Sequence, residues 1–196
     1  MKLSHFFTTV RLVLAPVFFV LYFLPEYYAS FNIISAYILI PLFIFMEFTD
    51  FLDGFFARKN KQVSDFGKLF DPFADVMANL TVLLVFTLAN YLPSIFFLLI
   101  LYREMSMMFI RMLASRQGIT IAARKSGKLK TVLYIIAAGF SLLLESCSRI
   151  DINVSFLEMY GKTINYGLYI IALLVSLLSF ADYLIHFIPQ IVKDQN

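Results

Sequence analysis

Residues 50–75 read DFLDGFFARKNKQVSDFGKLFDPFAD and lie between two long apolar runs. Asp50 and Asp53 are three residues apart at the end of the first run, so a helical backbone places both on one face. Asp71 and Asp75 are four residues apart at the start of the second run, which places them on one face of the next helix. Because the connection is short, we expect the two helices to be antiparallel neighbours whose acid pairs face each other.

Four carboxylates that converge beside hydrocarbon repel one another and are costly to bury without a counterion. A hard divalent cation removes that cost, since Mg²⁺-type ions prefer oxygen ligands and keep positions open for substrate phosphates. Two such ions, Mg²⁺ or Mn²⁺, would suit an in-line displacement at a phosphoryl group. A structural interpretation also exists, because Asp followed by Pro72 is a common helix start. The predicted metal ligands are Asp50, Asp53, Asp71 and Asp75.

The remainder of the chain is unusually apolar. Of its 196 residues, 61% are hydrophobic, 23 are Phe and only 15% are charged, whereas soluble domains are about half apolar and a quarter charged. The surplus must face lipid, which predicts an all-α integral membrane protein and excludes a soluble enzyme. The single cysteine excludes a disulfide scaffold. The net charge of +3 is too small to indicate nucleic acid as a partner.

Apolar runs of about 20 residues cross a bilayer as helices. We predict six transmembrane helices in one catalytic domain, residues 1–196, with a short interfacial segment at residues 3–11. A tight turn at residues 90–93 separates the third and fourth spans. Most Lys and Arg then lie on the side of both chain ends, which the positive-inside rule assigns to the cytoplasm. The predicted spans are residues 6–24, 31–53, 69–90, 93–114, 128–144 and 164–187.

The fourth span carries three charges within its apolar run. Arg103 falls near the middle of the span, where a guanidinium is costly, so the side shared by Arg103 and Arg111 should line a polar cavity. Alternatively, Arg103 forms a structural ion pair with Glu104 or Glu47, and Arg111 extends toward the aqueous side. A cluster of cations suits an anionic substrate. The candidate ligands for its phosphate are Arg103, Arg111, Lys128 and Lys130.

Residues 50–75 match the pattern Asp-x2-Asp-Gly-x2-Ala-Arg-x8-Gly-x3-Asp-x3-Asp without a gap. This pattern resembles the signature of the CDP-alcohol phosphatidyltransferases, integral membrane enzymes in which an acceptor hydroxyl displaces CMP from a CDP-linked substrate. The resemblance implies a cavity facing the cytoplasm, a homodimer, and Asp75 as both a metal ligand and the base that deprotonates the acceptor. It also implies that CDP and its metal ions are bound by Asp50, Asp53, Gly54, Ala57, Arg58, Gly67 and Asp71.

Residues 8–16 and 103–131 are similar to the bacterial phosphatidylglycerophosphate synthases within that family. This similarity implies CDP-diacylglycerol as donor, glycerol 3-phosphate as acceptor, phosphatidylglycerophosphate as product, and a location in the bacterial inner membrane among its lipids. Val76 stands where these enzymes usually carry Lys, and Glu47 where a small residue is commoner. Both departures weaken an anion site, so an inositol phosphate, phosphatidylglycerol or another alcohol is the alternative acceptor.

Two other classes of protein share some of these features. An intramembrane ion transporter would also place acids in a membrane, but it should show internal repeats or broken helices at mid-membrane depth. An inactive, lipid-binding relative of the family would not need all four acids of residues 50–75. No convincing repeat is present and the acids are intact, so an enzyme is favoured.

Overall fold

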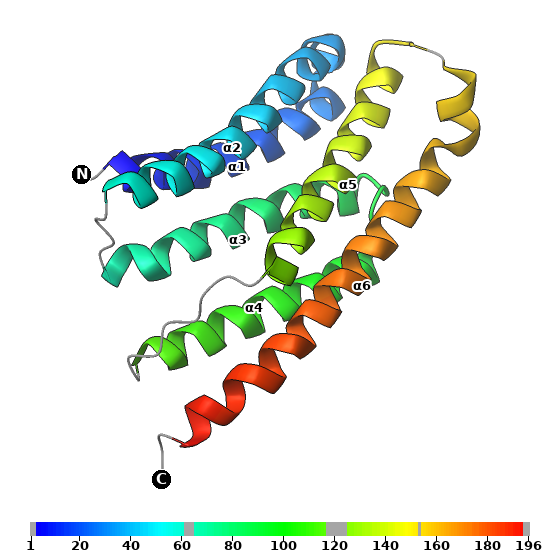
Figure 1. The fold of residues 1–196 in the computed structure, drawn as a ribbon. Helices are drawn as coiled ribbons and strands as arrows, with labels where there is room; N and C mark the ends of the chain where they lie inside the picture. Colours follow the sequence, from blue (N-terminus) through cyan, green and yellow to red (C-terminus); the bar gives the residue numbers. More distant parts are fainter. Residues whose placement is uncertain (1–2, 61–64, 117–124, 153, 194–196) are drawn as a thin grey trace.

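The fold is known from a computed structural model that describes residues 3–60, 65–116, 125–152 and 154–193, with side chains described for residues 6–49, 67, 70–116, 127–152 and 154–187. The described residues contain helices and no strand, which confirms the predicted all-α class. Figure 1 shows their arrangement. The helices are α1 (Leu3–Tyr27), the short η1 (Ala29–Phe31), α2 (Asn32–Asn60), α3 (Asp65–Leu88), α4 (Ser94–Arg116), α5 (Lys125–Arg149) and α6 (Ser155–Lys193).

Five of the described helices are long and apolar enough to cross a membrane: α1, α2, α3, α5 and α6. Their outer surfaces carry exposed aliphatic side chains, such as Ile44 at 61% and Leu178 at 71% exposure, which aqueous solvent would disfavour. The chain is therefore a multi-pass membrane protein. The fourth predicted span corresponds to α4, which is long enough but is not among the five because Arg103, Glu104 and Arg111 interrupt its apolar stretch.

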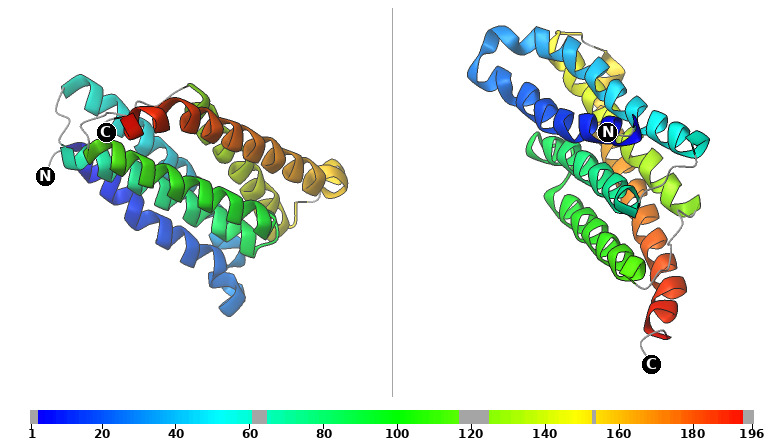
Figure 2. Two further views of the ribbon diagram at one scale, coloured as in Figure 1. Left: turned by 90° about the horizontal axis from the view of Figure 1, so that it is seen from below. Right: turned by 90° about the vertical axis from the view of Figure 1, so that its left-hand side faces the viewer.

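Helix α1 lies between α2 and α3 and packs against both (Figures 1 and 2). Phe18 of α1 is fully buried and contacts Phe43 of α2 and Phe86 of α3, with ring centroids 6.3 and 6.5 Å apart. We expected α2 and α3 to be neighbours because their connection is short. They do not pack extensively on each other over the described residues, because the aromatic face of α1 fills the space between them.

The predicted interfacial segment at residues 3–11 is not a separate element. The chain is one continuous helix from Leu3 to Tyr27. Thr8 and Arg11 are buried in its first turns and bond to acids of α3, as described below. The polar side chains of Thr8 and Arg11 thus point into the protein and not toward a membrane surface.

The predicted turn at residues 90–93 is confirmed. Asn90 adopts a left-handed backbone with φ of 62°, a conformation that Asn tolerates better than most residues. The backbone N–H groups of Tyr91 and Leu92 donate to the Phe86 carbonyl at 2.8 and 3.0 Å. These bonds satisfy the last carbonyl groups of α3, so the chain reverses between α3 and α4.

A buried polar cluster ties the helices together at the end of α5 that lies far from Lys128 and Lys130. Arg149 donates to the Glu145 carboxylate at 2.7 Å, to the Ser35 hydroxyl at 2.6 Å and to the Tyr22 carbonyl at 2.9 Å. Tyr91 donates to the same Glu145 at 3.0 Å. Burial and the Glu145 carboxylate raise the pKa of Tyr91, so its hydroxyl keeps the donated proton.

Arg149→Leu should lower the free energy of unfolding by about 3 kcal/mol, because Glu145 is left in the interior without its cationic partner. Thermal unfolding of the detergent-solubilised protein measures this effect. Lys162→Met, an exposed lysine of α6, is the matched control and should change the unfolding free energy by less than about 0.5 kcal/mol. Equal unfolding temperatures for the two variants would show that the cluster contributes nothing to stability.

Candidate active site

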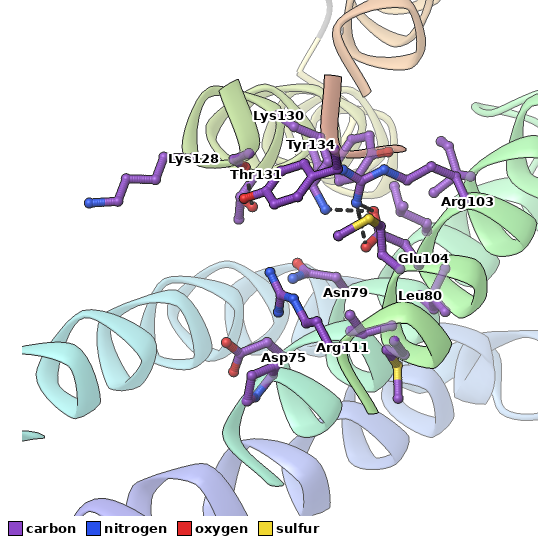
Figure 3. Close-up of a pocket in the computed structure, with 18 residues that line it drawn as sticks. Asp75, Asn79, Leu80, Arg103, Glu104, Arg111, Lys128, Lys130, Thr131 and Tyr134 are labelled. Atoms are coloured by element: carbon purple, nitrogen blue, oxygen red, sulfur yellow. Dashed lines mark hydrogen bonds and ion pairs between the residues drawn. The ribbon is translucent and has the colours of Figure 1, made fainter. Parts of the chain in front are cut away.

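A cavity of about 290 Å³ lies between α3, α4, α5 and α6. Figure 3 shows Asn79 extending from α3 toward α5, with Asp75 on the same helix and Arg103 and Arg111 on α4. Leu80, Leu83 and Ile100 close its apolar side. The polar lining consists of Asp75, Asn79, Arg103, Glu104, Arg111, Lys128, Lys130, Thr131, Tyr134 and Tyr183.

Two carboxylates on the first turns of α3 are held by donors on α1. Thr8 Oγ1 donates to Asp71 Oδ1 at 3.0 Å, and Arg11 Nη2 lies 2.5 Å from Asp75 Oδ1. Thr8 and Arg11 are almost completely buried, whereas the side chain of Asp75 is 38% exposed and lines the cavity. The neighbouring helix therefore orients both acids, and Asp75 still faces the space where a substrate would bind.

On the opposite side of the cavity, Glu104 joins two cations in the interior. It accepts two bonds from Arg103 Nη1, both of 3.0 Å, and one of 2.5 Å from Lys130 Nζ. All three residues are buried. Of the two partners considered for Arg103, Glu104 is the one it bonds to, and Arg103 also lines the cavity. Arg103 thus forms the predicted ion pair and also lines the predicted polar cavity.

Arg111 differs from Arg103 and Lys130 because it forms no ion pair within the described part of the chain. Its buried Nε atom has no hydrogen-bond partner there, and the same is true of Nε of Arg103. Lys128 is exposed and extends away from the other cations (Figure 3). All four predicted phosphate ligands therefore border one cavity. Arg103 and Lys130 are paired with Glu104, whereas Arg111 and Lys128 form no ion pair with a carboxylate among the described residues.

Helix α6 contributes to the site in a way that sequence reasoning missed. Ser179 lies 3.5 Å from Arg103 Nη2, and Ser176 accepts a 2.6 Å bond from the Tyr134 hydroxyl. Tyr183 is 98% buried, and its ring would lie within 4 Å of a Cβ atom added to Gly127. Small polar residues at helical spacing in an apolar span resemble ordinary packing residues, so no signal in the sequence pointed to them. Asn79 was missed for the same reason.

Comparison with known proteins adds family evidence to this geometry. The sequence profile of a family described as CDP-alcohol phosphatidyltransferase matches residues 1–180. The chain belongs to the CDP-alcohol phosphatidyltransferase family. It is therefore an enzyme of the class that the acid signature predicted, and the matched residues include the acids and the cations of the cavity.

Several bacterial members of this family are named CDP-diacylglycerol–glycerol-3-phosphate 3-phosphatidyltransferase. One from Treponema pallidum is 41% identical over 195 residues, which cover 96% of this chain and 90% of the relative. One from Bacillus subtilis is 33% identical over 72% of this chain and 77% of the relative. One from Aquifex aeolicus is 31% identical over 99% of this chain and 100% of the relative.

Members of this phosphatidyltransferase family generally depend on a divalent metal, and the described acids fit one. Asp71 and Asp75 are one helical turn apart on α3, and Asp75 attracts a cationic group, the Arg11 guanidinium. Carboxylate oxygens are the ligands that Mg²⁺ and Mn²⁺ prefer. No group of three or more metal-binding side chains occurs within the described residues. Of the four predicted metal ligands, Asp50 and Asp53 have side chains outside that part of the chain.

The remaining predicted ligands of CDP and metal are only partly described. The backbone of α2 is helical through Asn60, so Asp50 and Asp53 are on one helix face as expected. Gly67 is buried near the start of α3. The predicted roles of all these residues stay predictions. The residues whose side chains lie outside the described part of the chain are Asp50, Asp53, Gly54, Ala57 and Arg58.

Proposed function

We propose that this enzyme transfers the phosphatidyl group of CDP-diacylglycerol to glycerol 3-phosphate, giving phosphatidylglycerophosphate and CMP. The observation that carries the proposal is one cavity that joins Asp75 of the family signature to a group of buried cations. An acid beside cations suits an acceptor with a hydroxyl at one end and a phosphate at the other. The names of the relatives support the same donor and acceptor.

In the reaction, the hydroxyl oxygen of glycerol 3-phosphate forms a bond to the phosphorus that bears diacylglycerol. The bond from that phosphorus to the oxygen of CMP breaks, and CMP leaves with the electron pair. The hydroxyl proton passes to the Asp75 carboxylate, whose position in the cavity lets it act as general base. Arg11 holds this carboxylate in place through the 2.5 Å ion pair.

The predicted metal ligands are Asp50, Asp53, Asp71 and Asp75, and we propose that they hold two Mg²⁺ or Mn²⁺ ions. When bound, the ions would neutralise negative charge on the diphosphate and on the departing CMP. Gly54, Ala57, Arg58 and Gly67 would then surround the CDP moiety. The bonds from Thr8 and Arg11 to α3 restrict the side chains of Asp71 and Asp75 before any substrate binds.

The acceptor phosphate would be bound by Arg103, Arg111, Lys128 and Lys130. Support comes from their common cavity and from the buried Nε donors of the two arginines, which lack partners within the described residues. A buried donor without an acceptor is costly, and a phosphate oxygen supplies the acceptor. Glu104 holds Arg103 and Lys130 in place and prevents an excess of positive charge.

We also propose that residues 1–196 form one domain in the bacterial inner membrane, with the cavity and both termini on the cytoplasmic side, and that it assembles as a homodimer. Successive helices alternate in direction, so the start of α1 and the end of α6 lie at the same end of the bundle (Figure 1). An even number of crossings requires α4 to cross as well. Its charges favour the protein interior, since Arg103 and Glu104 are buried against α5 and α6.

The proposed reaction is tested by CMP release from the purified protein in detergent micelles containing CDP-diacylglycerol. With Mg²⁺ present, glycerol 3-phosphate should release CMP at least about 100-fold faster than glycerol, inositol, inositol phosphate or phosphatidylglycerol. The physical reason is that the cations of the cavity favour a phosphorylated acceptor over a neutral alcohol. Glycerol 3-phosphate is also smaller than inositol phosphate or phosphatidylglycerol, so it can place its hydroxyl beside Asp75 while its phosphate binds the cations.

Chelation with excess EDTA serves as the control for the metal and should stop CMP release, with recovery on adding Mg²⁺ or Mn²⁺. Faster release with another alcohol would assign the enzyme a different acceptor within its family. No release with any alcohol would contradict transferase activity altogether.

A further inference from the structure

Asn79 places an uncharged amide among the charges of the cavity. It lies on α3 four residues after Asp75, which corresponds to about 6 Å along the helix axis. The side chain is half-buried and lines the cavity beside the apolar Val76 and Leu80. Figure 3 shows it on the side of the cavity that also holds Asp75, directed toward α5.

The other uncharged polar groups of the cavity are already engaged. Thr131 donates to the Gly127 carbonyl at 3.3 Å, and Tyr134 donates to Ser176 at 2.6 Å. Tyr183 also has a bonded or stacked partner. The amide of Asn79, in contrast, forms no hydrogen bond with any other residue that the structure describes. The half-buried amide therefore keeps its donor and acceptor groups available to a ligand that enters the cavity.

The proposed acceptor has three polar groups and the residues assigned so far account for two. The attacking C1 hydroxyl faces Asp75, and the C3 phosphate faces the cations. The C2 hydroxyl needs a neutral group that both donates and accepts a hydrogen bond, which an amide provides. We infer that the Asn79 amide binds the C2 hydroxyl of glycerol 3-phosphate, an inference that rests on the proposed function. This contact would make the enzyme prefer an acceptor whose attacking hydroxyl has a second hydroxyl on the adjacent carbon.

The test compares glycerol 3-phosphate with 3-hydroxypropyl phosphate, which keeps the attacking hydroxyl and the phosphate but lacks the C2 hydroxyl. The wild-type enzyme should favour glycerol 3-phosphate by about tenfold in kcat/KM, the effect of about one neutral hydrogen bond. Asn79→Leu should lower kcat/KM for glycerol 3-phosphate by about tenfold and leave that for 3-hydroxypropyl phosphate within about twofold, so that the preference disappears. Both acceptors are measured on one preparation, so the ratio does not depend on the fraction folded.

Thr131→Val is the matched control, because Thr131 lines the same cavity but its hydroxyl bonds to Gly127. It should keep the wild-type preference. If Asn79→Leu does not fold, Asn79→Ala should abolish the preference in its place.

The inference is overturned if the folded Asn79 variant still prefers glycerol 3-phosphate over 3-hydroxypropyl phosphate, or if the wild-type enzyme shows no such preference. In both cases the proposed function stands. If wild type releases CMP with neither acceptor, the proposed function fails, and the inference fails with it.

Discussion

Asp75→Asn should lower the rate of CMP release from CDP-diacylglycerol and glycerol 3-phosphate by about 10³-fold. An amide has nearly the same shape as the carboxylate, but it cannot take the proton of the attacking hydroxyl and is a poor ligand for a divalent ion. The loss should appear mainly in kcat, because the acceptor phosphate is bound by other residues. Initial rates of CMP release at saturating acceptor measure the effect.

Folding is a separate concern for this variant, because Asn replaces the carboxylate that lies 2.5 Å from the Arg11 guanidinium. Gel filtration and thermal unfolding of each preparation therefore accompany the rates. Asp151→Asn is the matched control: Asp151 is an exposed acid in the turn after α5, and its φ of 53° suits Asn equally well. It should retain activity within about twofold. A folded Asp75→Asn enzyme with more than a tenth of wild-type activity would show that Asp75 is not the base.

Arg111→Met should raise the KM for glycerol 3-phosphate by about 10²-fold or more while changing the KM for CDP-diacylglycerol little. Arg111 lines the cavity and forms no ion pair with a described carboxylate, so its full charge is available to the acceptor. Each charge-assisted hydrogen bond to a phosphate is among the strong ones in proteins, and a guanidinium can form two. Methionine keeps most of the apolar stem, which limits the change in packing.

Arg111→Lys should recover only part of the loss, since an ammonium group keeps the charge but not the planar pair of donors. The matched control is Arg116→Met, because Arg116 is exposed at the end of the same helix and does not line the cavity. Its KM for glycerol 3-phosphate should stay within about twofold of wild type. Equal KM values for glycerol 3-phosphate in Arg111→Met and wild type would show that Arg111 does not bind the acceptor phosphate.

Local features of the fold were predictable from the sequence. The turn at residues 90–93 was predicted because Asn90 and Pro93 restrict the backbone within the turn itself. The helical ranges of α1 to α6 contain the predicted spans almost entirely, since each depends on one continuous apolar run. The resemblance of residues 50–75 to a known signature indicated the family, which the comparison confirms.

Interactions between distant segments were not predictable in the same way. The sequence left Glu104 and Glu47 as alternative partners of Arg103, because the choice depends on how α4 is rotated against its neighbours. It contained no indication that Lys130 of α5 shares Glu104, or that Thr8 reaches Asp71 across 63 positions of sequence. The short connection between α2 and α3 also gave no indication that α1 packs against both helices along the described residues.

The sequence by itself determined that the chain lies in a membrane, which acids share a helix face, and which family it belongs to. The first two properties follow from composition and from the helical repeat, which depend only on nearby residues. The family follows from the resemblance of residues 50–75 to a known signature, which the family match confirms. Only the tertiary structure decided that α1 packs against both α2 and α3, that Glu104 bridges two cations, and that Asn79 faces the cavity. The helical repeat specifies the faces of each helix, but which faces meet depends on packing among residues that are far apart in the chain.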